Sequence, residues 1–595
     1  MNDEHTTPPQ GSEEHSIRST TRRTFLKGAA VVAAAAGIGT AVGLEGTPAS
    51  AATQAAPGES GTTTILGPLS PRVRAQTAFR IKTENARFQF RKPIPDHRNN
   101  GDESRFPNMV GQFHKGLPHN EFGEVDLAAY RALILALSTG EYSDFERIPL
   151  AGTARLVNPQ ASLAFDTEGV DSHQLTMPPA HPIDSAERAA EAVEVYWMAL
   201  ARDVPFTQYG EEPLTQAAIA DLNGLSTSIF VTPVTAANLF RLGLGGEQFS
   251  DLIGPFISQF LLVPFNEGVI PIDHKIRTYR SLADGGRDFL ADVASWLAAE
   301  DGQVTIDASA VADPVFRHVR SGRDLAQYVH IDVVYQLNQE YVNAKSILVG
   351  EGAEIPAGIP SAPLSPTNPY RTSRTQEGFP TLGAGFIVAM LGEVSQRALQ
   401  AQWVQKWLVH RVLRPEAFSG LVHFQMTQGR YPFLHRDILN SPALPLVFER
   451  NGTYLLPQTF PEGSPLHPAY ASGHATIAGA CATLLKAFFD ETTKITSLFT
   501  PQVPTPDGLS LVDYTGADAD QMTVGSELNK PASNEARGRH IAGVHWHSDG
   551  VEAMLLGEQV AIALLQDVKQ TLNEFRTGGF SEFTFHDFQG NVVNI

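Results

Sequence analysis

Three short segments in the last third of the chain carry the side chains that could bind an anion and do chemistry on it. The first is KWLVHRVLRP at 406–415, in which Lys406 and Arg414 stand eight residues apart. Eight residues make about two and a quarter helical turns, so on one helix ended by Pro415 both cations can face the same side. Two cations at this spacing are usually a solvated helix face, so the pair gains meaning only from the segments that follow it.

The second segment, HPAYASGH at 467–474, precedes the strongly helical stretch ATIAGACATLLKAFF. Ser472 and Gly473 are therefore expected at a helix N-terminus, where free backbone N–H groups and the helix dipole favour an anion. Gly473 would let a ligand approach the backbone closely. A simple Ser N-cap explains the same pattern. His474 in the first turn favours the anion site, because an imidazole that titrates beside an anion can move protons.

The third segment, RHIAGVHWHSD at 539–549, is expected to open a helix that continues to about Asp567. Arg539 adds a third cation. His545 and Asp549 form an i, i+4 pair, so the carboxylate could accept a hydrogen bond from one ring nitrogen and leave the other nitrogen free to bind a metal.

A zinc site is the rival interpretation of this third segment, because His540 and His547 lie close to His545 in the sequence. A zinc site without thiolates would need three converging ligands, and the pattern H-E-x-x-H is absent. Cys481 is the single cysteine of the chain, so neither an intrachain disulfide nor a thiolate cluster can form. Any metal must be held by nitrogen or oxygen ligands.

In chain order the three segments have the form K-x7-R-P, S-G-H and R-x5-H-x3-D. This order resembles the signature shared by the vanadium haloperoxidases and the type 2 phosphatidic acid phosphatases, two families with one helical fold and one oxyanion cage. The resemblance implies an all-α fold, a large helical bundle, with a vanadate cofactor whose vanadium is bound by His545 and with Asp549 orienting that histidine. It also implies an anion cage around the vanadate oxygens, made of Lys406, Arg414, Ser472, Gly473 and Arg539.

Further details resemble the peroxidase branch, and within it the bromoperoxidases of red algae and their bacterial relatives. One is His467, seven residues before His474, where fungal chloroperoxidases carry a Phe. Two departures remove no ligand: Ala471 precedes Ser472 where the family often has Pro, and Gln405 replaces a basic or aromatic residue. The similarity extends through three stretches outside the site, 117–126, 186–206 and 239–262.

The resemblance also implies a reaction. Hydrogen peroxide replaces vanadate oxygens, a halide (bromide favoured) attacks the bound peroxide, and the hypohalous acid that leaves halogenates small organic acceptors. Vanadium acts as a Lewis acid. His474 would take a proton from peroxide, Lys406 would polarise the bound peroxide oxygen, and His467 would tune the halide side.

Two other functions remain open from the residues. An exported phosphatase of the same superfamily would use His545 as nucleophile and His474 to protonate the leaving group, and because vanadate resembles the phosphoryl transition state the cage alone does not decide. A non-catalytic anion-binding or scaffold protein has less support, because every catalytic position carries a competent side chain.

The rest of the chain must supply the elements that position these segments. Its 595 residues are 42% hydrophobic and 18% charged, which predicts globular structure with one large or two to three ordinary cores. The formal charge of −20 argues against a nucleic-acid partner. Helical patterns dominate from residue 85, one of them starting at Asp184 with Glu187 completing a capping box. We expect an N-terminal helical region at 85–350, a Pro-rich loop or seam at 351–385, and a C-terminal helical region at 386–595 that carries the vanadate site and is interrupted by a proline-containing break at about 493–534.

The first residues are expected to be a targeting signal rather than part of the folded domain. Arg22 and Arg23 open a twin-arginine signal peptide at 1–51, with an apolar run shorter than the roughly 20 residues of a membrane span and a small-residue cleavage site. A Gly-, Thr- and Pro-rich tether is expected at 52–84. The mature chain should therefore work in the periplasm or outside the cell, without an integral membrane span, and its algal resemblance implies a homo-oligomer.

Overall fold

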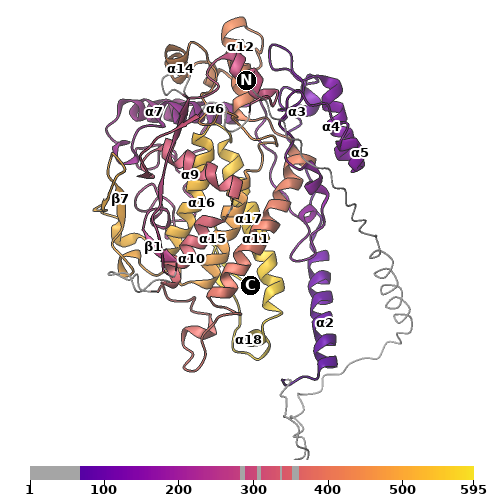
Figure 1. Cartoon of the computed structure of the whole chain (residues 1–595), viewed down its shortest axis with the longest axis vertical. Helices are drawn as coiled ribbons and strands as arrows, with labels where there is room; N and C mark the ends of the chain where they lie inside the picture. Colours follow the sequence, from indigo (N-terminus) through magenta and orange to yellow (C-terminus); the bar gives the residue numbers. More distant parts are fainter. Residues whose placement is uncertain (1–66, 268, 282–287, 305–309, 336–337, 351–360) are drawn as a thin grey trace, which may run out of the picture. The chain divides into compact units, whose positions relative to one another are not determined.

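The computed structural model describes residues 67–267, 269–281, 288–304, 310–335, 338–350 and 361–595 (Figure 1). Residues 76–595 form one compact unit, separate from residues 1–75, and the packing described below lies within 76–595. The expected signal peptide at 1–51 lies outside the described residues, as do residues 52–66 of the tether and 351–360 of the Pro-rich segment.

The described chain is mainly helical, which confirms the all-α fold class. The α-helices are α2 (Pro71–Phe90), α3 (Asp102–Arg105), α4 (Leu127–Thr139), α5 (Tyr142–Phe145), α6 (Ala186–Ala201), α7 (Pro213–Gly224), α8 (Val293–Glu300), α9 (Gly322–Tyr335), α10 (Gln339–Val349), α11 (Ala384–Val404), α12 (Pro415–Gln428), α13 (Arg436–Leu439), α14 (Ala443–Asn451), α15 (Gly473–Phe488), α16 (Val524–Ile541), α17 (His547–Lys569) and α18 (Asn573–Arg576).

The strands of the described residues are two or three residues long and form two-stranded antiparallel pairs. The pairs are β1 (Phe265–Glu267) with β2 (Ile270–Ile272), β3 (Lys275–Ile276) with β6 (Arg317–His318), β4 (Tyr279–Ser281) with β5 (Ala310–Ala312), β7 (Gln502–Pro504) with β8 (Leu511–Asp513), and β9 (Thr584–His586) with β10 (Val592–Asn594).

Helix α15 lies at the centre of the core, packed against α11, α16 and α17 (Figure 1). Every residue from His474 to Phe488 is buried, as expected for a helix that is apolar all round. Two glycines bring α15 and α17 into backbone contact: a Cβ on Gly479 would lie 2.2 Å from the Met554 carbonyl oxygen, and one on Gly557 would lie 1.9 Å from that of Thr476. The two helices are thus held at a fixed, short separation.

Several expected boundaries are wrong, each because a local signal was overridden by its neighbours. Helix α6 begins at Ala186 with Ser185 as its N-cap, accepting from the Arg188 N–H at 3.0 Å, so the capping box of Asp184 and Glu187 does not form. The predicted break at 493–534 ends early, because the fully buried α16 starts at Val524 and contains Pro531.

The tether prediction is wrong for residues 71–84, which belong to α2. Tertiary contacts hold the end of this helix: Asn85 Nδ2 donates to the Asp567 carbonyl oxygen at 3.0 Å, and Gln89 Nε2 donates to the Asp567 carboxylate at 2.8 Å. A composition of Gly, Thr and Pro upstream of residue 70 could not reveal these contacts with α17.

The described part of the Pro-rich segment is a loop inside the compact unit, with one 3-10 turn at Pro369–Arg371. The Ser365 N–H donates to the carbonyl oxygen of Phe488 at 2.8 Å, which holds this loop at the end of α15. None of the described helices combines the length and apolarity needed to cross a membrane.

Candidate active site

Lys406 and Arg414 lie on different elements, so the expectation of one helix ended by Pro415 is wrong. Residues Gln405–His410 form a π-helical turn after α11, and Arg411 then adopts a left-handed conformation with φ 45°. Arg414 is the N-cap of α12 and Pro415 begins that helix. Proline suits the first turn of a helix, where its missing N–H would have no partner in any case, so the sequence KWLVHRVLRP fits a helix start as well as a helix end.

The two cations nevertheless converge on the same stretch of backbone. Lys406 Nζ donates to the carbonyl oxygens of Pro468 and, at 3.0 Å, Ala469. Arg414 Nε donates to the carbonyl oxygen of His467 at 3.0 Å. The first and second sequence segments are therefore brought together, with both cations fully buried.

Ser472 and Gly473 lie where the sequence predicts, at the N-terminus of α15. Ser472 is the N-cap residue, but its side chain makes no cap hydrogen bond, and its buried Oγ has no partner among the described residues. The simple N-cap interpretation is therefore wrong. A Cβ on Gly473 would lie 3.2 Å from the Gln402 side-chain amide, so a larger residue would fill this tight approach to the backbone.

His474 lies in the first turn of α15, as predicted. Its buried Nε2 has no hydrogen-bond partner in the described part of the chain. Burial, reinforced by Arg539, holds the pKa of His474 well below its usual value, which favours the neutral ring.

The third segment does not open a single helix. Arg539 lies in the last turn of α16, the chain turns through Gly543 with φ 87°, and α17 starts only at His547. His545 and Asp549 still pair, with His545 Nδ1 2.8 Å from Asp549 Oδ2. Asp549 occupies the first turn of α17 and accepts from the Trp546 N–H at 3.0 Å, so the pair is built by helix capping rather than by a shared helical face.

The contact with Asp549 fixes which nitrogen of His545 can bind a ligand. The carboxylate accepts, so Nδ1 carries the hydrogen and Nε2 presents its lone pair. Arg414 Nη1 lies 2.8 Å from this Nε2 and donates to it. The guanidinium group of Arg414 thus stands at the position from which an electrophile would approach His545.

The site has an excess of positively charged side chains. Within the described residues, Lys406 and Arg414 donate their hydrogen bonds to backbone carbonyls and histidine nitrogens rather than to carboxylates. Burial lowers the pKa of Lys406 well below its usual value and that of Arg414 to about 9. Burial, with Arg414 and Lys406, also lowers the pKa of His545, whereas burial raises the pKa of Asp549 to about 7. An anion bound here would stabilise the charged forms of both cations.

A cavity of about 420 Å³ opens onto this site. Its lining contains residues of the second and third segments, among them His467, His474 and His545. The lining also includes one face of α11, which was not among the predicted site residues. Helical spacing upstream of Lys406 was the signal that could have revealed it. The lining residues of that face are Gln396, Leu399, Gln400 and Trp403.

His540 and His547 do not join His545. His540 Nδ1 lies 3.0 Å from Arg537 Nη1, and His547 Nδ1 lies 3.1 Å from Glu194 Oε2. Among the described residues, no three His, Cys, Asp or Glu side chains around His545 lie close enough together to hold a metal ion. The geometry therefore disfavours the zinc interpretation of the third segment and leaves an anion site centred on His545.

Comparisons with known proteins agree with this geometry. Residues 452–574 match the family model of the VCPO second helical-bundle domain, and residues 19–39 match that of the twin-arginine translocation pathway signal sequence. A vanadium-dependent bromoperoxidase of Ascophyllum nodosum is 34% identical over 520 residues, covering 84% of this chain and 88% of that protein. One of Corallina pilulifera is 32% identical over 593 residues, covering 85% and 93%.

A solved structure shares the fold. The second vanadate-dependent bromoperoxidase of Ascophyllum nodosum, described as homohexameric, superposes with a TM-score of 0.79 and 30% identity, covering 91% of this chain and 94% of that one. Fold, site and relatives together define the chain as a vanadium-dependent haloperoxidase. Within that class it belongs to the family of the vanadium-dependent bromoperoxidases, and it carries a twin-arginine export signal.

Proposed function

We propose that this chain oxidises bromide with hydrogen peroxide, at a vanadate ion that His545 binds through Nε2. The observation that carries the proposal is the buried, positively charged cage around a histidine nitrogen whose lone pair Asp549 has fixed. Relatives named vanadium-dependent bromoperoxidases over most of the chain length support the same activity.

The cage fits vanadate in charge and in hydrogen bonding. Lys406, Arg414 and Arg539 can offset its negative charge. The Ser472 hydroxyl, which has no hydrogen-bond partner among the residues that the structure describes, and the α15 N-terminus can donate to its oxygens. The Gly473 backbone leaves room for that approach. When bound, vanadate supplies a Lewis-acidic centre that activates peroxide towards attack by a halide.

Arg414 must change partners for this to happen. Its Nη1 donates both to the Val544 carbonyl oxygen at 2.7 Å and to His545 Nε2 at 2.8 Å. An anion bound at this site would take over the second hydrogen bond from His545, which would free the histidine lone pair. The cation is thus already in place beside the charge that it will offset.

His474 is the proposed proton acceptor. Its buried Nε2 has no hydrogen-bond partner among the described residues, and the residue lines the cavity through which peroxide would reach the site. A neutral imidazole in the wall of this cavity can remove a proton from hydrogen peroxide, and Arg539 beside it disfavours premature protonation.

His467 is the proposed residue on the halide side. Its Nδ1 lies 2.9 Å from Arg414 Nη2, and its ring packs against Trp403 with centroids 5.1 Å apart. It therefore contacts both the anion cage and the apolar face of α11 in the cavity wall. Such a position lets it act on the halide without binding vanadium.

The cavity above the site has room for a small organic acceptor, and the Leu399 and Trp403 side chains give part of it an apolar surface. We also expect a homo-oligomer, as in the homohexameric relative. The twin-arginine signal directs the folded chain to the periplasm or the extracellular space.

The decisive experiment is an activity assay of the mature protein with and without orthovanadate. One arm supplies bromide and hydrogen peroxide, the other a phosphate ester. We expect vanadate-dependent bromide oxidation and negligible ester hydrolysis. Ester hydrolysis that vanadate inhibits, without bromide oxidation, would instead assign the chain the phosphatase chemistry of its superfamily, with His545 as nucleophile.

A further inference from the structure

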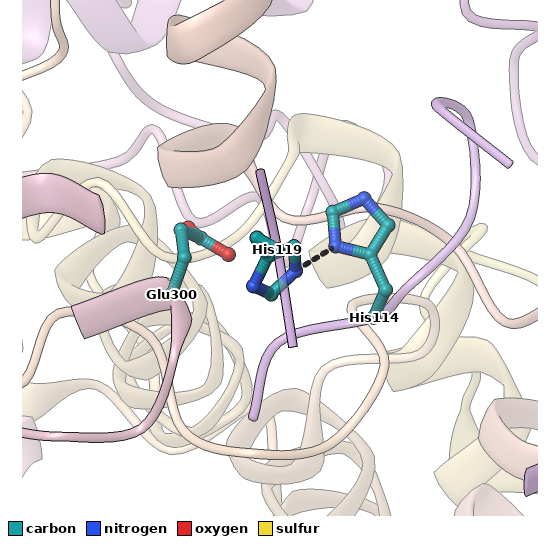
Figure 2. Close-up of side chains that lie close together, drawn as sticks. All are labelled: His114, His119 and Glu300. Atoms are coloured by element: carbon teal, nitrogen blue, oxygen red, sulfur yellow. Dashed lines mark hydrogen bonds between the residues drawn. The ribbon is translucent and has the colours of Figure 1, made fainter. Parts of the chain in front are cut away.

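A second cluster of metal-ligating side chains lies outside the anion cage. His114, His119 and Glu300 point toward one another in Figure 2, with one ligand atom from each within 4.8 Å of the others. His114 and Glu300 are 4% and 1% exposed, and the side chain of His119 is fully buried. No local sequence pattern marks this cluster, because Glu300 comes about 180 residues after the two histidines.

The two histidines form a hydrogen bond in which His114 donates and His119 accepts. His119 Nδ1 lies 2.9 Å from Asp301 Oδ1, so it carries the hydrogen, and its Nε2 presents a lone pair to His114 Nδ1, 2.9 Å away. Burial, together with His119, holds the pKa of His114 well below its usual value, so that ring is neutral. If the His114 proton moves from Nδ1 to Nε2, both facing nitrogens become metal ligands.

Among the described residues, no cation forms an ion pair or hydrogen bond with Glu300, although a buried carboxylate normally has one. Its carboxyl group instead shares a side-chain hydrogen bond with that of Glu416. Its neighbour Glu416 already has Lys115, whose Nζ lies 2.6 Å from Glu416 Oε1. Burial and the Glu416 carboxylate raise the pKa of Glu300 well above its usual value. A divalent cation would displace the proton that the Glu300 and Glu416 carboxyl groups share, and would supply the positive charge that Glu300 lacks.

The backbone holds the cluster in place. Glu300 ends α8, and its carbonyl oxygen accepts from the Gly116 N–H at 2.6 Å, which ties α8 to the loop that carries both histidines. The Leu117 N–H closes a turn onto the carbonyl oxygen of His114 at 3.0 Å. Three ligands on a hydrogen-bonded loop and an adjacent helix end need little reorganisation to bind an ion.

We propose that His114, His119 and Glu300 bind a zinc ion, with Asp301 orienting His119 from behind. Two imidazoles and one carboxylate are a common zinc ligand set, and a carboxylate behind a ligating histidine is its usual support. Tetrahedral ligands about 2.0–2.1 Å from zinc lie roughly 3.3 Å apart. The histidine nitrogens therefore separate slightly from 2.9 Å, while the Glu300 oxygen moves inward.

The zinc ion would brace the segment that leads to Arg414. One residue before His114, the Phe113 N–H donates to the carbonyl oxygen of Arg411 at 2.7 Å, and Gln112 pairs with Val412 as an antiparallel bridge. The proposed role is structural, because a cross-link between α8 and the loop at 114–119 would also hold the adjoining residues that form this bridge.

The test is a zinc titration of the mature protein by calorimetry, after treatment with a chelator and in the presence of vanadate to keep zinc from His545. We expect one zinc ion per chain. Glu300→Gln, which preserves shape, should weaken binding by at least about 10-fold, and His119→Ala by more than the roughly 100-fold that loss of a supporting residue can give. Replacement of exposed His173 by Ala should change nothing.

Two further arms make the result specific. The same titration on His545→Ala should still show one zinc ion, so failure of the proposed vanadate site would not affect the outcome. Cobalt(II) in place of zinc should give visible absorption bands that Glu300→Gln alters. No stoichiometric zinc, zinc binding unchanged in both Glu300→Gln and His119→Ala, or a preference for calcium over zinc would each overturn the proposal.

Discussion

Two buried clusters of charged residues flank the start of α17, and they differ in the partners of their cations. In the anion cage, Lys406 and Arg414 face carbonyls and histidines. In the neighbouring paired network, every charge meets an opposite one. Its contacts include Arg537 Nη2 to Glu194 Oε1 at 2.9 Å, Arg188 Nη1 to Glu191 Oε2 at 2.7 Å, and His547 Nδ1 to Glu194 Oε2 at 3.1 Å.

The titration of the two clusters follows from this difference. Burial opposes ionisation of Glu191, yet Arg188 and His181 bring its pKa down to about 2. In the cage, burial and neighbouring cations lower the pKa of Lys406 instead. Buried charges that already have partners stabilise the fold, whereas buried cations without a carboxylate are stabilised by an anion from outside. Within residues 540–547, this difference distinguishes His540 and His547, which belong to the paired network, from His545 in the anion cage.

The largest expected effect is on the cage. Orthovanadate should raise the melting temperature of the wild-type chain, because a ligand at 100 times its Kd adds about 2.7 kcal/mol of stability. His545→Ala should abolish this shift together with bromide oxidation, since Nε2 is the proposed metal ligand. Thermal unfolding with and without vanadate measures it. His173→Ala is the control, and full bromide oxidation in His545→Ala would refute the ligand assignment.

The paired network should show the opposite behaviour. Glu194→Gln leaves Arg537 buried without its counter-charge and should lower the free energy of unfolding by about 3–5 kcal/mol. The vanadate-induced shift should remain. Denaturant unfolding measures the loss, and Asp96→Asn, which removes an exposed pair with Arg98, should change stability by no more than about 1 kcal/mol. A Glu194→Gln chain of normal stability would erase the distinction between the clusters.

The proton acceptor should reveal itself in the pH profile. Neutral His474 is the base, so the rate at limiting peroxide is present above its pKa and lost as the pH falls through it. Bound vanadate raises that pKa from the low value that burial and Arg539 produce. His474→Ala should lower this rate by about 10²–10⁴-fold and remove the acidic limb, while vanadate still binds. An acidic limb that persists in His474→Ala would assign the base elsewhere.

Asp549 lies between the two clusters, and its effect should be intermediate. It fixes the His545 tautomer, and its pKa of about 7 marks it as a carboxylate that burial makes hard to ionise. Asp549→Ala should weaken vanadate binding by about 10 to 100-fold, as expected for a residue that supports a ligand. Asp549→Asn, which can still accept from Nδ1, should lose less. Equal vanadate affinity in the wild type and Asp549→Ala would contradict the role.

The smallest effect concerns halide choice. His467→Phe removes the contact with Arg414 and gives the site the side chain of fungal chloroperoxidases. It should shift the ratio of bromide to chloride oxidation by about tenfold, the lower end of what a change in pocket shape produces. The dependence on peroxide should change less. Steady-state kinetics in both halides decides the matter, and an unchanged ratio would leave His467 without a halide role.

The sequence predicted the fold class and most of the environment of the site, because helix N-termini and motif spacing are local properties. Ser472, Gly473 and His474 lie at the start of α15, as expected. The path from Lys406 to Arg414 could not be predicted, because the left-handed Arg411 is held by a contact with Glu103, 308 residues away. Its guanidinium donates to that carboxylate at 2.5 Å.

The same reason explains what was missed. The cluster of His114, His119 and Glu300 depends on a backbone contact between α8 and a distant loop, and no local pattern records it. The pairing of His547 with Glu194 spans 353 residues. Periodicity could have marked Trp403 and its neighbours on α11, since these share one helical face, but only the folded chain shows that a cavity lies against that face.

The glycine contact between α15 and α17 has a consequence for the chemistry at their ends. Gly479 and Gly557 set the separation of two helices whose N-terminal turns carry Ser472 on one side and Asp549 on the other. The Ser472 N–H donates to the Asp549 carbonyl oxygen at 3.1 Å, so any change in that separation acts directly on this contact. A misplacement of 1 Å can reduce a rate by about 100-fold. The two glycines therefore determine the geometry of the active site through the distance between α15 and α17, although neither glycine lies in the site itself.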